Sequence, residues 1–267
     1  MGIARLKHLN VVVLRARPSF SSSISSRPDS LEAALTGGGA QVHQLPVQII
    51  EPVPDDDVAI KAQIGAIDSY QKAIFVSRYA AYFALHWLDN CQLSQRPANQ
   101  CFAIGPTTAA LLREKQIQVT LPGSVWSSEG LLALPEMNNV AGQNIIIFRG
   151  LGGRPHLGEV LAERGALVEY CELYKRLPDQ RFGGEIIGLL DSERTSVLVA
   201  LSGGALDALL AVGGKRHQPL MLKTPVIVPG TRLQNHAQGL GFVKVVVAPS
   251  PLAKDIERAI TGWYTQA

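Results

Sequence analysis

Cysteine is scarce in this sequence, and the three cysteines that occur form no recognisable motif. Cys91, Cys101 and Cys171 are widely spaced, odd in number and outside any CxxC pattern. A disulfide framework needs cysteines that can pair, and a thiolate metal site needs closely spaced ones. The sequence therefore predicts neither, and it fits a reducing compartment such as the cytoplasm.

The sequence also lacks metal-binding histidine motifs and dense clusters of charge, which argues against a metal site and a nucleic-acid partner. The six histidines show no HxH or HExxH spacing, so we expect no metal site. Charged residues make up 18% of the chain, Lys and Arg are scattered, and the formal net charge is +3. Such dispersed charge argues against nucleic-acid binding but allows a mildly electropositive site for an acidic small molecule.

Long hydrophobic runs are missing as well. The apolar run at residues 11–14 is interrupted by Arg15, so the sequence predicts neither a signal peptide nor a membrane span. Hydrophobic residues nevertheless form 46% of the 267 residues, which is ample for a buried core. We therefore expect a cytoplasmic protein with one large domain or two of ordinary size.

Short segments recur along the chain at a nearly constant offset. The segment GGAQV (38–42) returns as RGALV (164–168), and FVSRYA (75–80) aligns with ALSGGA (200–205). Gly105 likewise aligns with Gly230. The offset is about 126 residues, give or take one, and a register kept over most of a chain indicates internal duplication.

Apolar runs alternate with segments of helical spacing. The stripes Leu157, Val160, Leu161, Arg164 and Leu252, Ile256, Ile260, Trp263 are typical of helices that pack one face on a sheet. The apolar runs are continuous, which is typical of strands covered on both faces. This alternation predicts an α/β fold with parallel sheets. The predicted strands are residues 11–14, 74–76, 101–104, 145–148, 197–200, 225–228 and 243–247.

Two proline-containing stretches are candidate linkers. They cover residues 45–57 and 176–184, and their Pro52 and Pro178 lie one repeat unit apart. If the chain crosses between domains at both, two parallel connections form a hinge. The predicted domains are an outer, discontinuous α/β domain of residues 1–46 and 176–267, and an inserted α/β domain of residues 47–175.

A glycine-rich turn follows the strand at 145–148. A dinucleotide fingerprint needs glycine where Pro155 stands, and a P-loop needs Lys and Ser or Thr where Glu159 follows Gly158. Neither pattern is met. Two interpretations stay open: the glycines only shape a tight turn, or Arg149 and Arg154 beside a helix N-terminus bind another kind of anion.

Six segments together carry a family resemblance. In this order and spacing they resemble the uroporphyrinogen-III synthase family over essentially the whole chain. Two stretches depart from the family pattern, SFSSSISSRPDS after Pro18 and VPGTRLQNHAQGLG at residues 228–241. The segments are RARP, IFVSRYAAYFAL, AIGPTTAALL, SSEGLLAL, FRGLGGRPHLGEVLAERGALVEYCELYKR and GLGFVKVVVAPSP.

The resemblance implies a two-domain enzyme of the cyclising hydro-lyase type. It implies two flavodoxin-like parallel-sheet domains joined by a two-stranded linker, with the active site in the cleft between them. The reaction implied is cyclisation of hydroxymethylbilane to uroporphyrinogen III, with loss of water and inversion of ring D, in tetrapyrrole and haem biosynthesis. No metal or organic cofactor is expected. We expect a monomer that makes transient contact with the upstream hydroxymethylbilane synthase, and no nucleic-acid or membrane partner.

A substrate with many carboxylates needs many hydrogen-bond donors. The turns before four predicted helices follow strand ends and leave free backbone N–H groups, which suit carboxylates. Ordinary N-capping by their hydroxyls is an equally open interpretation, and both can hold. The predicted substrate-binding residues are Arg17, Ser77, Thr107, Thr108, Ser128, Arg149, Gly153, Arg154, Ser202, Gly203 and Thr231.

Tyr174 is the predicted catalytic residue. It stands where the family carries a tyrosine proposed to assist departure of the substrate hydroxyl, so this role comes from the resemblance. A phenol with a pKa near 10 can donate a proton while uncharged at neutral pH. The alternative is a linker tyrosine half packed on a domain face.

Weaker candidates and other protein classes remain. Ser127, Ser128 and Glu129 are typical of a helix start, with substrate contact as the alternative, and residues 55–57 are typical of a solvated linker face. A non-catalytic two-domain receptor for an anionic small molecule would share the hinge, but a periplasmic one would carry an export signal. A flavodoxin would bind flavin, and a response regulator would need an acidic cluster at a strand end.

Overall fold

The computed structural model describes residues 6–19, 30–91, 100–123 and 125–266. Its chain divides into two compact units, unit 1 with residues 1–50 and 176–267, and unit 2 with residues 51–175. The chain passes from one unit to the other twice, within β2 (Gln41–Pro52) and within β7 (Leu167–Pro178). Most of the long loop after Pro18, residues 20–29, lies outside the described residues.

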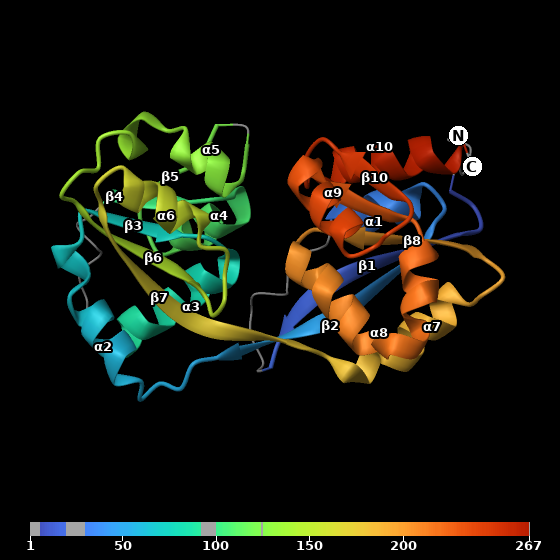
Figure 1. Ribbon diagram of the computed structural model, residues 1–267, viewed down its shortest axis with the longest axis horizontal. Coiled ribbons are helices and arrows are strands. Elements are labelled where there is room, and N and C mark those ends of the chain that lie inside the picture. The colour runs from blue at the N-terminus through green and yellow to red at the C-terminus, as the bar shows by residue number, and fades with distance from the viewer. Residues whose placement is uncertain (1–5, 20–29, 92–99, 124, 267) are drawn as a thin grey trace. The chain divides into compact units, whose positions relative to one another are not determined.

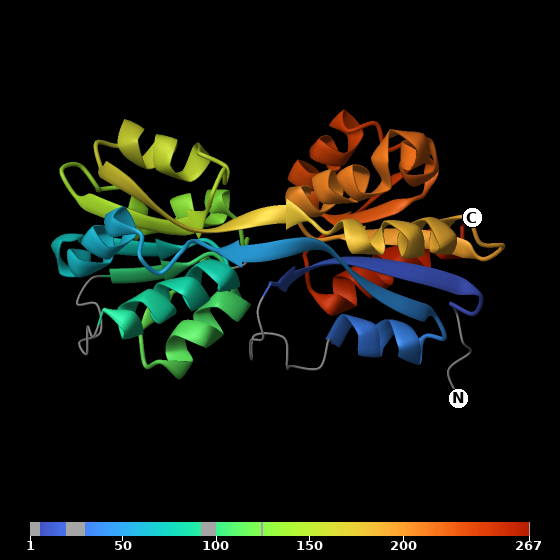
Figure 2. The ribbon, with the colours of Figure 1, turned by 90° about the horizontal axis from the view of Figure 1, so that it is seen from below.

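Unit 1 is a parallel sheet in the order β2-β1-β8-β9-β10 with helices on both faces (Figures 1 and 2). Apolar residues of α7, α8 and α9 pack with one face of the strands, and those of α1 and α10 pack with the other. Its elements besides β2 are β1 (Leu9–Pro18), α1 (Ser30–Gly37), η4 (Gln180–Phe182), α7 (Gly183–Leu190), β8 (Thr195–Ala200), α8 (Gly203–Lys223), β9 (Val226–Pro229), α9 (Gly230–Gly239), β10 (Val245–Ala248) and α10 (Ala253–Tyr264).

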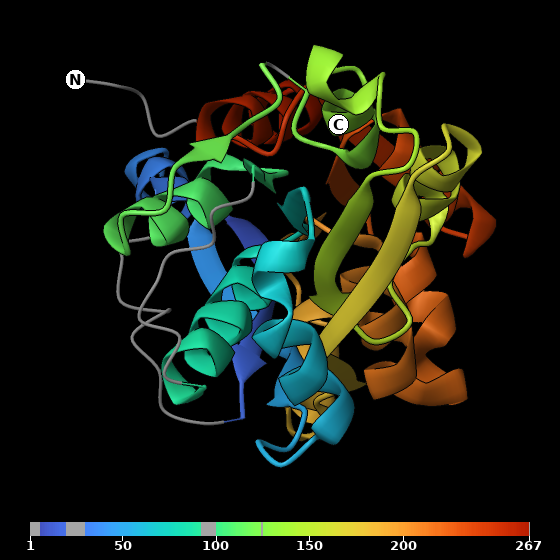
Figure 3. The same cartoon turned by 90° about the vertical axis from the view of Figure 1, so that its left-hand side faces the viewer.

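Unit 2 is a second parallel sheet region in the order β7-β6-β3-β4-β5. Helices α5 and α6 pack their apolar residues on one face. Figure 3 looks onto this unit, with α3 and α6 on different sides of β6 and β7. Its elements besides β7 are α2 (Val58–Gly65), η2 (Ile67–Ser69), β3 (Lys72–Phe75), α3 (Arg78–Asn90), β4 (Gln100–Ala103), α4 (Pro106–Glu114), β5 (Val119–Thr120), α5 (Ser128–Leu132), η3 (Pro135–Met137), β6 (Asn144–Gly150) and α6 (His156–Glu163).

The predicted parallel α/β class is confirmed, and so are all seven predicted strands. Three strands were missed. The short β5 has only two residues, whereas β2 and β7 mix polar and apolar residues, and the predicted linkers at 45–57 and 176–184 overlap only their C-terminal parts. β2 and β7, which carry the chain between the units, are neighbours in the hydrogen-bonded strand order, as expected of a two-stranded linker.

Both units have the same strand order once chain connectivity is set aside. This order is the doubly wound order 2-1-3-4-5. Positions 1 to 5 are occupied by β1, β2, β8, β9 and β10 in unit 1, and by β6, β7, β3, β4 and β5 in unit 2. The order reverses between β1 and β8, and between β6 and β3. Ligands of such sheets bind beyond the carboxyl ends of the strands at this reversal. The functional residues should therefore be sought at those strand ends.

Candidate functional site

Two serines occupy equivalent positions at these strand ends. Ser77 follows β3 and accepts a hydrogen bond from the Ala80 N–H at 3.0 Å, so it is the N-cap of α3. Ser202 follows β8 and accepts one from the Ala205 N–H at 3.3 Å, so it is the N-cap of α8. The aligned repeat thus places matching serines at matching turns. The N-cap interpretation is confirmed for both, and it leaves the substrate-binding interpretation open.

The predicted threonines lie differently from the serines. Gly105 and Pro229 are the N-caps of α4 and α9, and neither helix has a side-chain cap. Thr107 and Thr108 therefore lie inside the first turn of α4, as does Thr231 in α9. Thr108 is buried, whereas Thr107 and Thr231 are exposed. The capping interpretation was wrong for these three hydroxyls, which leaves the first backbone N–H groups of both helices without a side-chain cap.

Tyr174 is fully buried in β7, with 0% of its surface exposed. Its hydroxyl oxygen lies 2.9 Å from the Ser77 hydroxyl oxygen, within hydrogen-bond distance. Its ring packs against those of Tyr79 and Phe83, at centroid distances of 6.0 and 5.7 Å. The alternative of a half-packed linker tyrosine is therefore wrong. The buried hydroxyl ends at the N-cap of α3, where a strand end meets a helix start.

A local irregularity in strand pairing places this tyrosine. The register of β6 and β7 shifts between Arg149 and Gly150, so that Gly150 pairs with Tyr174. The Leu151 N–H then donates to the Tyr174 carbonyl oxygen at 2.8 Å. A Cβ atom on Gly150 would lie only 2.6 Å from Cε2 of the Tyr174 ring. The absence of a side chain at Gly150 is thus what gives the ring its place.

The glycine-rich turn between β6 and α6 is organised by Arg149. This residue is only 8% exposed, and its guanidinium donates to the carbonyl oxygens of Gly153 and Arg154, the latter at 3.4 Å. It also lies over the Tyr170 ring at 4.2 Å and forms an ion pair with Glu172 at 3.1 Å. Arg149 therefore holds the turn closed. A contact with substrate would have to compete with these bonds.

Arg154 is more accessible and pairs with Glu129. Its Nη1 donates to Glu129 Oε1 at 2.6 Å, and both side chains are 45% exposed. Burial by itself raises the pKa of Glu129, but hydrogen bonds from its own backbone N–H, Arg154 and Ser127 outweigh burial and lower it to about 2. Ser127 is the N-cap of α5, and its hydroxyl oxygen accepts a hydrogen bond from the Gly130 N–H at 3.2 Å. The predicted helix start is confirmed, with Ser128 as the first helical residue.

The Glu129 pair gives a pH-dependent prediction. Because the folded pKa is below the ordinary value near 4.5, the stabilisation is present above about pH 4.5 and is lost as pH falls toward 2. At pH 7, Glu129→Gln should therefore unfold at a lower urea concentration than the parent. Its free energy of unfolding should be lower by less than about 1 kcal/mol, because the pair is half exposed. The difference should vanish near pH 2. Glu163→Gln, on exposed α6 surface, is the control; an equal deficit there would contradict the assignment.

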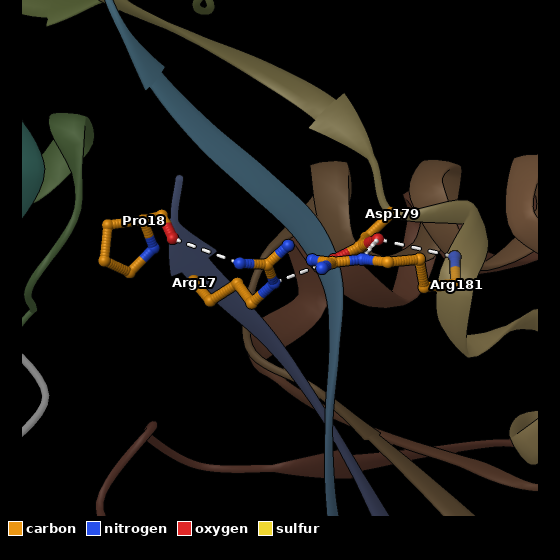
Figure 4. Close-up of polar contacts among 4 residues, drawn as sticks. All are labelled: Arg17, Pro18, Asp179 and Arg181. Atoms are coloured by element: carbon orange, nitrogen blue, oxygen red, sulfur yellow. Dashed lines mark hydrogen bonds and ion pairs between the residues drawn. The ribbon is translucent and has the colours of Figure 1, made fainter. Parts of the chain in front are cut away.

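A charged cluster at the carboxyl end of β1 was only partly predicted (Figure 4). Asp179 is 1% exposed and accepts from Arg17 Nε at 2.8 Å, and from Arg181 Nε and Nη2, both at 2.9 Å. The Arg17 and Arg181 side chains are 31% and 64% exposed. Two guanidiniums share one carboxylate, so the cluster has a net positive charge. The sequence predicts Arg17 as a binding residue, whereas Asp179 and Arg181 lie in the stretch 176–184 that it predicts to be a linker.

The remaining predicted residue, Gly203, is the first residue of α8. A Cβ atom there would lie 3.1 Å from Cδ2 of His236, so the helix start approaches α9 closely. His236 Nε2 in turn lies 3.0 Å from Asp207 Oδ1. This turn is therefore shaped by packing as well as by the Ser202 cap.

Within the units, the structure brings the predicted residues into three groups. Tyr174 contacts Ser77, Arg149 holds Gly153 and Arg154, and Arg17 pairs with Asp179. Over the described ranges of the chain, no group of His, Cys, Asp and Glu could hold a metal ion. Within the same ranges, no helix is both long and apolar enough to cross a membrane. A surface hollow of about 510 Å³ lined by Arg113 and Gln118 lies beside β5 in unit 2.

Comparison with known sequences gives one consistent answer. A family model described as Uroporphyrinogen-III synthase HemD matches residues 29–256. The chain is 35% identical to a uroporphyrinogen-III synthase from Salmonella typhimurium over 175 residues, which are 65% of this chain and 71% of that protein. It is 32% identical to the one from Escherichia coli over 188 residues, 70% of this chain and 76% of that protein.

Comparison with solved structures agrees at the level of the fold. A uroporphyrinogen III synthase from Thermus thermophilus aligns with a TM-score of 0.62 at 18% identity, covering 96% of this chain and all of that one. A uroporphyrinogen-III synthetase from Helicobacter pylori aligns with a TM-score of 0.61 at 14% identity, covering 94% of this chain and 98% of that one. At these identities the likeness shows a shared two-domain α/β fold.

Proposed function

The chain belongs to the uroporphyrinogen-III synthase family, and from this premise we propose that it cyclises hydroxymethylbilane to uroporphyrinogen III. The reaction loses one water and inverts ring D. The comparisons support this activity and offer nothing for the alternative of a non-catalytic receptor for an anionic small molecule. Because the substrate is reactive by itself, holding it in a folded conformation supplies most of the catalysis.

The contact between Tyr174 and Ser77 carries the proposal at the level of residues. Departure of the substrate hydroxyl needs a proton, and a phenol can donate one without being charged at neutral pH. The pair lies at the carboxyl end of β3, beside the point where the strand order of unit 2 reverses. That is where ligands of doubly wound sheets bind. We assign Tyr174 as the source of this proton.

The carboxylates of the substrate are bound by donors at the same strand ends. In unit 2 these are the first backbone N–H groups of α3 and α4 and the guanidinium of Arg154. In unit 1 they are the helix starts at Gly203 and Thr231, with Arg17 and its neighbour Arg181. Charge-assisted bonds to guanidinium groups favour carboxylates. Arg149 contributes by shaping the turn that carries Gly153, and Ser128 by starting α5.

We further propose the setting in which this activity occurs. The enzyme acts in the cytoplasm as a monomer, uses no metal or organic cofactor, and receives its substrate by transient contact with hydroxymethylbilane synthase. Its folding domains are residues 1–46 with 176–267, and residues 47–175. The composition supports this setting, since its cysteines form no framework and its charge is low. Light scattering on the purified protein tests the monomer.

A coupled assay tests the function directly. Hydroxymethylbilane generated in situ should be converted by the parent protein to the III isomer, resolved from the I isomer that forms spontaneously. Heat-denatured protein is the control and should leave only the I isomer. If the folded protein also yields only the I isomer, the enzyme assignment fails.

A further inference from the structure

We propose that Ser77 is the catalytic residue that touches the departing hydroxyl, and that Tyr174 supplies the proton through Ser77. This inference rests on the proposed function and adds a residue to its chemistry. Tyr174 then acts as a positioning and proton-supplying residue behind Ser77. The sequence alone predicts Ser77 only as one of several substrate-binding residues.

Accessibility separates the two hydroxyl groups. Tyr174 has 0% of its surface exposed, and its ring is enclosed by Tyr79, Phe83 and the backbone of Gly150. Ser77 is only half-buried and follows the carboxyl end of β3. A general acid must come within hydrogen-bond reach of the atom that it protonates. Ser77 meets that condition without any movement of the buried ring.

The hydrogen-bonding capacity of a serine hydroxyl gives the relay its direction. Such a group has one hydrogen to donate and two lone pairs to accept. The Ala80 N–H occupies one lone pair at 3.0 Å, and the Tyr174 hydroxyl, at 2.9 Å, can occupy the other. The hydrogen of Ser77 is then free to point out of the turn. Both acceptor positions are then filled from inside the protein, and the hydrogen remains available to donate to the substrate.

The chemical step balances along this chain of hydroxyls. The carbon–oxygen bond of the substrate breaks with its electron pair on oxygen, which takes the Ser77 proton and leaves as water. Ser77 takes the proton of Tyr174. The resulting phenolate regains a proton through Ser77, which takes up the proton that a substrate ring carbon loses when the new carbon–carbon bond forms, so the sum is loss of one water. Meanwhile the negative charge lies beside the N-terminus of α3, a 13-residue helix whose dipole stabilises it.

A double-mutant cycle tests the relay. Tyr174→Phe and Ser77→Ala should each lower kcat by about ten- to a hundredfold with little change in KM, because each interrupts proton supply and neither removes a carboxylate donor. The kcat of the double variant should be no more than about threefold below that of the less active single variant, because the effects of groups that act as a unit are not additive. Independent roles would instead multiply the two losses.

Matched variants separate proton relay from helix capping. Ser77→Thr keeps both the hydroxyl and the cap and should stay within a few-fold of the parent, whereas Ser77→Asn keeps a capping oxygen without a hydroxyl and should lose kcat like Ser77→Ala. Asp57→Ala removes the N-cap of α2 in the same unit, where Asp57 accepts from two N–H groups at 3.0 Å, and should leave kcat unchanged.

The outcomes distinguish this inference from the proposed function. If the parent protein makes no uroporphyrinogen III, both the proposed function and the relay are wrong. A parent that makes the III isomer, together with multiplied losses in the double variant or a fully active Ser77→Asn, overturns the relay alone. Unchanged activity in Tyr174→Phe also overturns it, because the proposed source of the proton would then be dispensable.

Discussion

Gly150→Ala should lose about 2 kcal/mol of unfolding free energy and most of its kcat. The added Cβ would lie 2.6 and 2.7 Å from Cε2 and Cζ of the Tyr174 ring, closer than such atoms can approach. That ring is fully buried between aromatic neighbours, so it cannot swing away, and overpacking of this kind costs roughly 1–3 kcal/mol. Any shift would also take the Tyr174 hydroxyl away from Ser77. Urea unfolding and kcat/KM on the same preparation measure both effects.

Gly65→Ala is the matched control for this substitution. Gly65 ends α2 in the same unit, and a Cβ atom there would meet nothing within 4 Å. Its replacement should leave stability unchanged or slightly higher, because alanine restricts the unfolded chain. If Gly150→Ala behaves like Gly65→Ala in both measurements, then the ring of Tyr174 has room to move, and the close fit is not what positions its hydroxyl.

Most strands of the fold could be predicted from the sequence because they are buried on both faces. Residues 145–148 and 197–200 are continuous apolar runs, and every residue in both is buried. The stripe on α10 was also predictable, since Ile256, Ile260 and Trp263 pack on unit 1 as their spacing requires. Leu252 is the exception, because it precedes the helix as its N-cap and is 37% exposed.

The strands that carry the chain between the units escaped prediction for a physical reason. β2 and β7 are long and partly exposed, so their polar residues interrupt the apolar run that marks a buried strand. Pro46 and Pro52 within β2 favoured a linker. The burial of Tyr174 could not be predicted either, because it depends on a register shift between β6 and β7 and on the lack of a side chain at Gly150.

The candidate site was predictable where it repeats and not where it depends on long-range pairs. Ser77 and Ser202 were found because the duplicated segments align, and Gly39 and Gly165 likewise share positive φ values of 92° and 87° at matching helix-to-strand turns. Asp179 is separated from Arg17 by 162 positions, so nothing local indicates their contact. Such a pair becomes visible only when β1 and the end of β7 are placed in space.

Asp179→Ala should destabilise the protein by about 3 kcal/mol. Its carboxylate is 1% exposed and accepts hydrogen bonds from both Arg17 and Arg181. Removing one partner of a buried ion pair costs about 3–5 kcal/mol, because the charge left behind loses its compensation. Here the two guanidiniums are 31% and 64% exposed and can regain water, so the lower end of that range applies. Urea unfolding at neutral pH measures the loss.

Salt and a surface control decide whether this loss comes from the two guanidiniums. Without Asp179 they face each other uncompensated, and because they are partly exposed, added salt should screen their repulsion and recover part of the stability. Asp191→Ala, at the exposed C-cap of α7, should stay within about 0.5 kcal/mol of the parent at every salt concentration. Asp179→Asn keeps the size of the side chain and removes its charge, so it should lose stability and respond to salt as Asp179→Ala does. If Asp179→Asn instead matches the parent, the charge of Asp179 is not what holds Arg17 and Arg181 together.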